Sequence, residues 1–465
     1  MSTATLEKQD GFKSKWGFIM ACIGSAVGMA NIWRFPAMVS KYGGLTFLIP
    51  YFIFVVLIGM SGVMEEFALG RWGGAGPVGA FGKCTEERLG SKTPGQVIGA
   101  IPIIGSMGLA IGYSVVMGWI FKYAWMGISG GLFAMGQDMA TIGGTFGAAA
   151  PETATLGEGV SMMIEGGIFG VGNGAWIVVA IVVSAVIMAL GIAGGIEKAC
   201  KILIPALFGV FLLLAVYIAF LPGATDGYKY IFTLNPAGLA NIEVWIYAFG
   251  QAFFSLSVAG NGSVIYGSYL SKDVEISSSA RNVAIFDTLA ALVAMMVIIP
   301  AMATTGAQLD ASGPGLMFVY LVPVMNGMAG GRFVGMFFFI AVLFAGVSSI
   351  INLYEAPVAF MQEKLKLKRL PAVVVIHVVG LIVALLIQPW TSQWMDMVSI
   401  YICPFGAALA GVMFFWVLKK DTALDAVNEG SNKKIGGWFH PFGKFVYVPL
   451  CIVALVAGAM LGGIG

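Results

Sequence analysis

The sequence predicts an all-helical integral membrane protein, and two observations carry this prediction. Of its 465 residues, 59% are hydrophobic and only 10% are charged, whereas soluble domains average about 25% charged residues. The apolar residues form repeated runs of roughly 20 residues, the length of a membrane-spanning helix, rather than the shorter alternating strands of a β-barrel. The net charge of +2 gives no indication of nucleic-acid binding.

Eleven apolar runs are expected to cross the bilayer. They cover residues 16–37, 41–69, 97–127, 174–193, 195–221, 241–270, 281–306, 332–364, 370–388, 396–418 and 443–463. Several are longer than a span requires, so these helices must tilt, bend or extend beyond the bilayer. Residues 1–15 form a polar and then basic tail without the pattern of a cleavable signal peptide.

Charges in the connecting segments predict the orientation. Lys and Arg gather before the first run, after the second, between the fourth and fifth, and after the eighth and tenth. All of these positions fall on one side, which the positive-inside rule assigns to the cytoplasm. The opposite loop, 137–173, contains four acidic residues and no Lys or Arg. We therefore expect a multi-pass protein of the cell (inner) membrane with a cytoplasmic N-terminus and an external C-terminus.

The first run, 16–37, is predicted to be a discontinuous helix. It contains Gly24, Ser25, Gly28, Asn31 and Arg34. A helix-interior Gly costs roughly 1 kcal/mol relative to Ala, and buried polar side chains in hydrocarbon cost more unless they are paired. A broken helix exposes backbone carbonyls and amides at mid-membrane depth, where they can bind ions and small charged solutes.

The sixth run, 241–270, has a matching interruption. Its centre contains Ser255, Ser257, Gly260, Asn261 and Gly262. Interruptions five spans apart predict an inverted repeat, with residues 16–221 as the first half, 241–418 as the second, and 443–463 as an additional span. The alternative is that each Gly or Ser only allows close helix packing.

Ionisable and hydroxyl side chains within the other runs suggest cation sites. Glu66 and Asp287 lie deep in apolar segments, where a charge needs a partner or an ion. An ionised Asp287 facing Asn31 and Ser255 would bind a hard cation through oxygen, whereas the alternative is a protonated, hydrogen-bonded Asp. Ser348 and Ser349 could complete an oxygen cage for Na⁺, or merely bond to their own helix.

Two further features concern access to such a site. Arg34 and Asp396 are placed at the outer ends of their spans, where they could pair across a vestibule or instead extend separately to the headgroups. The outer loop 307–331 carries an apolar core that suggests a re-entrant or capping hairpin. No nucleotide-binding loop, His/Cys metal cluster or nucleophile elbow is present, so neither ATP-driven transport nor an enzyme is expected.

The motif GSAVGMANIWRFP (24–36) makes a family resemblance plain. The chain resembles the neurotransmitter:sodium symporters, in particular their bacterial amino-acid-transporting members, whose fold is the LeuT-type 5+5 inverted repeat with discontinuous helices 1 and 6. The supporting stretches, in the family's order, are GGLTFLIPY (43–51), EEFALGRWGG (65–74), QAFFSLS (251–257), GSYLSKD (267–273), GPGLMFVYLVP (313–323) and FAGVSS (344–349).

The resemblance implies roles for individual residues. It implies one sodium site formed by Ala26, Asn31, Ser255 and Asp287, and a second formed by Gly24, Val27, Ala345, Ser348 and Ser349. It implies a substrate pocket lined by Ala26, Gly28, Met29, Ala30, Leu109, Tyr113, Phe254, Ser255, Ser257, Gly260, Ser349 and Leu353. Tyr113 would bond the substrate carboxylate and Phe254 would form a lid. It also implies an outer gate of Arg34 and Asp396, and an inner gate with Glu363 as the acidic partner near Ser268 and Tyr269.

Departures from the family pattern refine the expected substrate. Amine-transporting relatives carry Asp at the position of Gly28, so the missing side chain favours amino acids over monoamines. Gly260 replaces a residue that is often large, which should widen the pocket for a bulky or aromatic side chain. Asp287 replaces the usual Asn and would supply the fixed negative charge that relatives obtain from chloride or from a Glu one turn later, where this chain has Ala291.

The inner gate and the C-terminal end also depart from the pattern. Phe12 replaces the usual Trp, and only Lys8 or Lys13 could replace the usual gate Arg. The common twelfth span is missing, as in many bacterial members.

The expected function is sodium-coupled import of a hydrophobic or aromatic amino acid by alternating access, with two Na⁺ ions and without chloride. The expected partners are the amino acid and the lipid bilayer; the sequence does not specify an oligomeric state. Two alternatives remain open at this point. One is a proton-coupled amino-acid transporter of the same fold, in which Asp287 or Glu66 titrates. The other is a non-transporting amino-acid sensor or channel.

Overall fold

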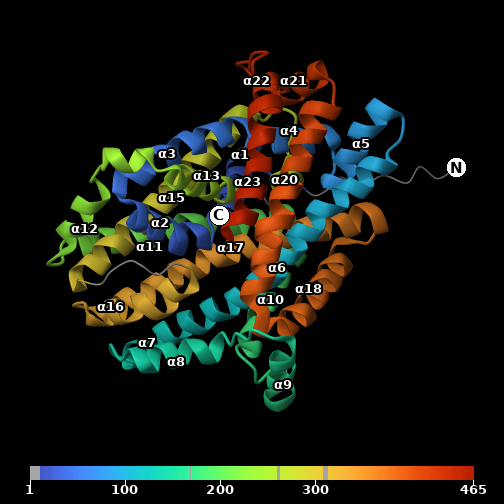
Figure 1. Cartoon of the computed structure of the whole chain (residues 1–465). Coiled ribbons are helices and arrows are strands. Elements are labelled where there is room, and N and C mark those ends of the chain that lie inside the picture. Colours follow the sequence, from blue (N-terminus) through green and yellow to red (C-terminus); the bar gives the residue numbers. More distant parts are fainter. Residues whose placement is uncertain (1–10, 168, 259–261, 307–312, 465) are drawn as a thin grey trace.

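The computed structural model describes residues 11–464 except 168, 259–261 and 307–312, and every regular element in those ranges is a helix. Eight helices are long and apolar enough to cross a membrane, and a bent pair formed by Lys15–Ala26 and Ala30–Tyr42 would be a ninth span. The predicted span 174–193 corresponds to the shorter apolar helix Gly174–Ala189. The predicted span 241–270 corresponds to the helices Ile242–Ser255 and Gly262–Ser268, which lie on either side of residues 259–261. The helical membrane architecture is confirmed, and eleven spans are compatible with it (Figure 1).

The first five spans comprise the following elements. They are α1 (Lys15–Ala26), η1 (Ala30–Arg34) and α2 (Phe35–Tyr42); α3 (Gly44–Ile58), η2 (Gly59–Val63) and α4 (Met64–Gly73); α6 (Thr93–Ser129); α10 (Gly174–Ala189); and η3 (Ile192–Ile196) with α11 (Glu197–Ala219).

The remaining spans continue in the same way. They are α13 (Ile242–Ser255) and α14 (Gly262–Ser268); α15 (Ile276–Thr305); α17 (Gly331–Leu365); α18 (Arg369–Leu386); η7 (Gln388–Trp390), α19 (Thr391–Asp396), η8 (Met397–Ile402), α20 (Cys403–Val412) and η9 (Met413–Val417); and α22 (Phe439–Phe442), η10 (Gly443–Tyr447) and α23 (Val448–Leu461).

Short helices connect the spans on both sides of the bundle. They are α5 (Pro77–Leu89), α7 (Gly131–Ala134), α8 (Met139–Ala149), α9 (Leu156–Gly166), α12 (Ala224–Ile231), η4 (Pro236–Ala240), η6 (Leu316–Tyr320), α16 (Leu321–Gly327) and α21 (Lys420–Asn428).

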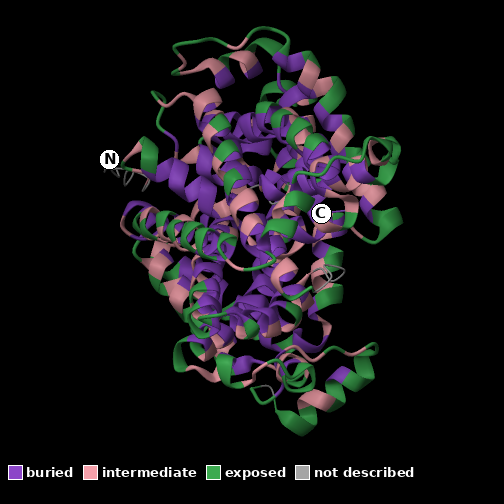
Figure 2. Cartoon of the chain, turned by 90° about the vertical axis from the view of Figure 1, so that its left-hand side faces the viewer, coloured by how far each residue is buried: buried purple, intermediate pink, exposed green. Residues whose placement is uncertain are grey.

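Burial separates a central group of helices from a peripheral group. In their most apolar windows α17 is 72% buried and α6 67%, whereas the span containing α11 is 33% buried and the one containing α23 is 28% buried. Figure 2 shows the buried residues concentrated inside the bundle and the exposed ones on its outer helices. Because exposed side chains of these outer helices are largely aliphatic or aromatic, the periphery suits contact with lipid hydrocarbon.

The apolar part of the 307–331 loop packs against the bundle. Residues 307–312 lie outside the described residues, and the part that follows forms η6 and α16. The ring of Phe318 stacks on Phe146 at 5.1 Å between centroids and meets Tyr123 edge-on at 4.8 Å. These aromatic contacts explain why a loop would carry such side chains; the predicted hairpin shape stays a prediction.

Glycines bring α4 and α14 into backbone contact. A Cβ added at Gly70 would lie 1.9 Å from the carbonyl oxygen of Val264, and one added at Gly267 would lie 2.5 Å from that of Phe67. No larger residue fits either position without separating the helices. The guanidinium of Arg71 then fixes the end of α4 by donating to the carbonyls of Val274, Ala426 and Glu429.

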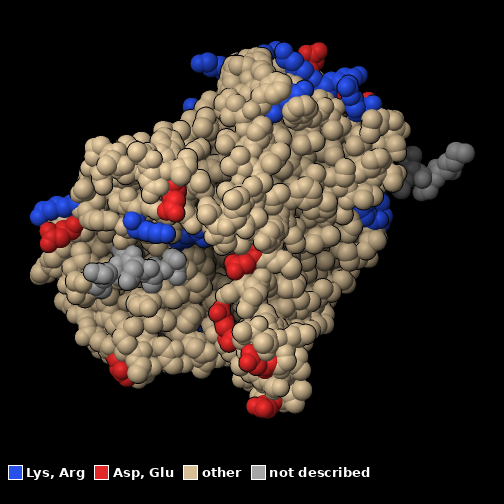
Figure 3. All heavy atoms as spheres, in the orientation of Figure 1, with Lys and Arg blue, Asp and Glu red and all other residues tan. Residues whose placement is uncertain are grey.

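Charged residues divide between the two ends of the molecule. In Figure 3, Lys and Arg gather over the end that carries α21, α22 and α5, and Asp and Glu predominate at the opposite end, near α9. The asymmetry agrees with the distribution expected from the loops, so the axis of the bundle has one basic end.

Candidate functional site

The first span breaks where the sequence predicts. α1 ends at Ala26, the following Val27 is extended with φ −72° and ψ 98°, and the helix resumes at Ala30 with its axis turned by 56°. The amide of Gly28 donates to Asn31 Oδ1 at 3.1 Å, so a side chain satisfies one backbone group that the break releases. The break therefore places backbone carbonyls and Asn31 side by side inside the bundle.

The sixth span is interrupted beside this break. α13 ends at Ser255, and Ser257 has φ 57°, a left-handed conformation that is unusual for a residue with a side chain. Ser257 Oγ donates to the carbonyl of Ser25 at 2.7 Å, which joins the two interruptions directly. Gly260 and Asn261, also predicted here, lie outside the described residues.

Asn31, Ser255 and Asp287 form what we call the carboxylate cluster. Asn31 Nδ2 donates to Asp287 Oδ1 at 2.8 Å and to Ser255 Oγ at 3.0 Å, and Ser255 Oγ donates to Asp287 Oδ2 at 2.6 Å. None of the three side chains is more than 1% exposed. The hydrogen-bond donors to Asp287 are neutral, so an ionised Asp287 would give the cluster both oxygen ligands and the negative charge that suits a hard cation.

Gly24, Val27, Ala345, Ser348 and Ser349 form what we call the neutral cluster. Ser349 Oγ lies 3.3 Å from the carbonyl oxygen of Gly24 and 3.0 Å from those of Val27 and Ala345. Ser348 Oγ donates to the Ala345 carbonyl at 2.9 Å. Three carbonyls and two hydroxyls thus converge from α1, its extended cap and α17, and such oxygens fit a small hard cation.

Gly28 lies between the two clusters and near the hydroxyl of Tyr113. A Cβ added at Gly28 would lie 3.4 Å from Ser349 Oγ and 3.7 Å from the Tyr113 hydroxyl. That hydroxyl is buried beside Ser349 and the backbone of Met29, but it forms no hydrogen bond of good geometry with a described residue. Because buried polar groups are normally satisfied, Tyr113 has a donor available for a solute placed beside Gly28.

The other predicted pocket residues differ in how far they are buried. Ala26 and Met29 are buried, while Ala30, Leu109, Phe254, Ser257 and Leu353 are partly exposed. Ser106 Oγ donates to the carbonyl of Leu353 at 2.8 Å, which fixes α17 against α6 at this level.

The predicted outer gate residues lie around one small cavity. Arg34, Asp396 and Phe254 line a space of about 40 Å³. No ion pair joins Arg34 to Asp396 in the part of the chain that the structure describes, and Arg34 Nε is buried without an acceptor. The two charges therefore share a cavity without direct contact.

The predicted inner gate residues are not joined to one another by the hydrogen bonds seen in the structure. Glu363 Oε1 accepts from the amide of Gly76 at 2.7 Å, Ser268 Oγ donates to the carbonyl of Ile265 at 2.6 Å, and Tyr269 donates instead to Glu355 at 2.7 Å. Glu363 ties α17 to the start of α5, whereas Tyr269 ties the segment after α14 to a different carboxylate of α17.

Sequence reasoning missed Glu355. It is fully buried and accepts two hydrogen bonds from the guanidinium of Arg369, at 2.9 and 2.7 Å. A signal was available, because a Glu in the apolar run of the eighth span requires a partner. The partner was harder to assign, since Arg369 lies at the start of the next span, where a positive charge is expected to set the orientation of the protein in the membrane.

A second missed carboxylate anchors the N-terminal segment. Glu197 accepts from the amide of Lys13 at 2.7 Å and from Ser14 Oγ at 2.9 Å, and it pairs with Lys201. Phe12 packs edge-on against Tyr266 at 5.5 Å. Lys13 thus contributes its backbone amide here, and Lys8 lies outside the described residues.

Comparisons with known proteins agree with these observations. The profile of the sodium:neurotransmitter symporter family matches residues 9–134 and 153–461. An uncharacterised sodium-dependent transporter of Methanocaldococcus jannaschii is 28% identical over 97% of this chain and 90% of its own length. An uncharacterised sodium-dependent transporter of Haemophilus influenzae is 28% identical over 98% of this chain and 99% of its own length.

A solved structure extends the likeness to three dimensions. The crystal structure of MhsT in complex with L-phenylalanine superposes with a TM-score of 0.78 at 28% identity, and the match covers 97% of this chain and 100% of that one. The relatives are transporters, so the chain is a sodium-coupled transporter rather than an enzyme, and a multi-pass membrane protein. It belongs to the sodium:neurotransmitter symporter family.

Proposed function

We propose that this protein imports a hydrophobic or aromatic amino acid together with two Na⁺ ions, by alternating access and without chloride. The observation that carries the proposal is the position of Gly28 between the carboxylate cluster and the neutral cluster, beside the unpartnered hydroxyl of Tyr113. A solute bound there would touch both oxygen clusters at once, which is the arrangement that coupled binding requires.

The expected substrate follows from the chemistry around Gly28. The Tyr113 hydroxyl would donate to the substrate carboxylate, and the absence of a side chain at Gly28 leaves room for that carboxylate. Leu109, Phe254 and Leu353 offer apolar surface for the side chain. L-Phenylalanine bound to MhsT, a similar protein, supports a large apolar or aromatic amino acid.

Each oxygen cluster would bind one ion. The first Na⁺ would be bound by the Ala26 carbonyl, Asn31, Ser255 and Asp287, with the substrate carboxylate as a further ligand. The second would be bound by the neutral cluster. Because Asp287 already places an anionic group beside the substrate, an added chloride would have no charge to compensate.

Alternating access would open the bundle at each end in turn. Arg34 and Asp396 would approach each other when the outer side closes, and the contacts of Glu363, Ser268 and Tyr269 would loosen when the inner side opens. The basic end is assigned to the cytoplasm, which places the N-terminus inside, the C-terminus outside, and the protein in the cell (inner) membrane.

Uptake by purified protein in liposomes tests the proposal. Labelled phenylalanine should accumulate when an inward Na⁺ gradient is imposed, lose this accumulation when K⁺ replaces Na⁺, and be unaffected when gluconate replaces chloride. A competition panel of the twenty amino acids then ranks substrates. Equal uptake in Na⁺ and K⁺ contradicts ion coupling, and loss of uptake in gluconate contradicts chloride independence. Substrate-driven acidification without Na⁺ would support the proton-coupled alternative.

A further inference from the structure

A large cavity lies on the side of the bundle. It has a volume of about 880 Å³ and lies between the second span, the seventh span and the segment that precedes α22. Val56, Met60, Ile285 and Leu289 form part of its wall, and each of these side chains is more than 40% exposed. Since they belong to membrane-spanning helices, the cavity opens toward the hydrocarbon of the bilayer.

The other end of this cavity is cationic. It is lined by Arg281, Lys433 and Lys434, together with one carboxylate, that of Glu275. Glu275 accepts from Ser277 Oγ at 3.0 Å, and none of the three cations forms an ion pair within the described residues. An anion bound there would meet three cations against one carboxylate, so this end of the cavity has an excess of positive charge.

The position of these charges matches the membrane interface. Arg281 lies near the start of α15, and Lys433 and Lys434 lie between α21 and α22, the helices at the basic end of the molecule (Figures 1 and 3). Trp438, half-exposed, lines the same rim, and Trp is enriched at the level of lipid headgroups. The cavity therefore runs from hydrocarbon depth to headgroup depth.

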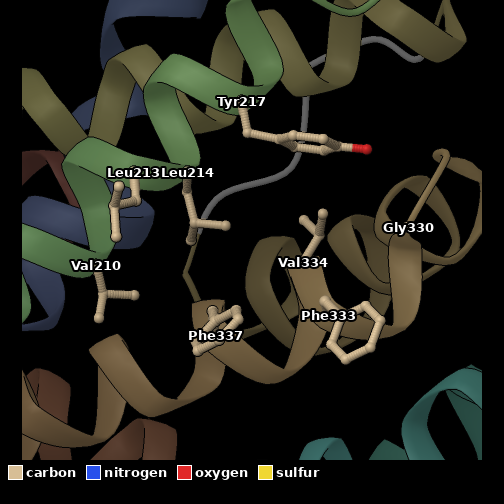
Figure 4. Close-up of a pocket in the computed structure, with 8 residues that line it drawn as sticks. All are labelled: Val210, Leu213, Leu214, Tyr217, Gly330, Phe333, Val334 and Phe337. Carbon is tan, nitrogen blue, oxygen red and sulfur yellow. The ribbon is translucent and has the colours of Figure 1, made fainter.

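A second lipid-facing cavity provides a contrast. It has a volume of about 300 Å³ between α11 and α17, whose apolar side chains face each other across it in Figure 4. Its one side-chain polar atom, the Tyr217 hydroxyl, donates to the carbonyl of Ala329. That cavity suits any hydrocarbon chain, whereas the larger one adds a charged end that selects among headgroups.

We propose that the larger cavity binds an anionic phospholipid from the leaflet at the basic end of the molecule. The phosphate and headgroup would lie among Arg281, Lys433 and Lys434, and an acyl chain would lie along α3, η2 and α15. Basic pockets between membrane helices recognise anionic headgroups by this combination of charge and apolar area. The proposal is independent of the substrate and of the sodium sites.

Lipid selectivity of the full-length protein provides the test. Protein in mixed micelles with equal amounts of phosphatidylglycerol and phosphatidylethanolamine is analysed by native mass spectrometry. We expect at least about fivefold more bound phosphatidylglycerol, because each nearby Lys or Arg favours an anionic headgroup. Glycerol 3-phosphate alone should not displace the lipid, since it lacks the acyl chains.

Two matched variants locate the site. The triple variant Arg281→Gln, Lys433→Gln and Lys434→Gln should lose the preference for phosphatidylglycerol. The control is a second triple variant, with Lys368→Gln, Lys419→Gln and Lys420→Gln, which removes the same number of charges from exposed positions outside the cavity. This control variant should keep the preference for phosphatidylglycerol. The proposal is overturned if the wild type binds both lipids equally, if both triple variants behave alike, or if glycerol 3-phosphate displaces the lipid.

Discussion

Two fully buried carboxylates, Asp287 and Glu355, are satisfied in different ways. Glu355 receives two hydrogen bonds from the Arg369 guanidinium and one from Tyr269, so the protein supplies its counter-charge. Asp287 receives hydrogen bonds from Asn31 and Ser255, both neutral. An unpaired buried charge is costly. Glu355 therefore has its counter-charge within the protein, whereas an ionised Asp287 would need a cation from outside the protein.

The largest expected effect on stability comes from breaking the ion pair between Glu355 and Arg369. Glu355→Gln leaves the Arg369 guanidinium, which is 14% exposed, without its carboxylate and should destabilise the protein by about 3 kcal/mol. Thermal unfolding in detergent measures this. Glu86→Gln is the control, because Glu86 and its partner Lys92 are 48% and 56% exposed, and it should change stability by less than about 1 kcal/mol. Equal effects would show that burial does not decide the strength of these pairs.

Removing the charge of Asp287 should affect transport rather than folding. Asp287→Asn keeps the size of the side chain but removes the anionic ligand, and should lower sodium-dependent uptake about 100-fold, as expected for a lost charged hydrogen-bonding group. Uptake assays in chloride and in gluconate measure it, and partial recovery in chloride would identify Asp287 as the fixed charge. Asp425→Asn, at an exposed position, should have no effect. Unchanged chloride-free uptake in Asp287→Asn would rule out this role.

The neutral cluster contains no charged side chain, so substitutions in it should reduce sodium-dependent uptake less than Asp287→Asn does. Ser349→Ala removes a hydroxyl that lies within 3.3 Å of three carbonyl oxygens. The half-saturating Na⁺ concentration should rise about tenfold, the value of one hydrogen-bonding group. Sodium titration of uptake measures this change. A variant with wild-type sodium dependence would place the second ion elsewhere.

Ser348→Ala should give the smallest effect of the series. The Ser348 hydroxyl bonds to Ala345 within its own helix, so its loss should raise the half-saturating Na⁺ concentration only about threefold, less than a hydrogen bond between elements. The same titration compares the two serines. If Ser348→Ala were the more severe change, the convergence of carbonyls on Ser349 would not reflect ion binding.

Of the two carboxylates, the sequence analysis identified Asp287 but not Glu355, and the difference shows how far sequence could predict the structure. Polar residues in apolar runs predicted the breaks near Gly28 and Ser257, and the structure brings Asn31, Ser255 and Asp287 within hydrogen-bonding distance. Their roles as ligands stay predictions. Glu355 was missed because its partner, Arg369, belongs to another span, and sequence spacing does not indicate which helices become neighbours.

Local sequence was a weaker guide where contacts depend on packing. Glu363 was expected to be the acidic gate residue near Tyr269, and sequence spacing did not indicate that its carboxylate also accepts from the amide of Gly76 at the start of α5. The short connecting helices, such as α8 and α9, begin at capping residues that include Asp138 and Thr155. Such caps are readable in sequence, but they are easily overlooked beside long apolar runs.

The glycine contacts between α4 and α14 have a mechanical consequence. Because the backbones touch at Gly70 and Gly267, a movement of α14 toward α4 would have to displace α4 as well. α4 in turn continues α3 through η2, so a displacement at the sixth span is passed along the whole second span. The close contact at these two glycines thus gives the second and sixth spans one shared packing surface near Gly70 and Gly267.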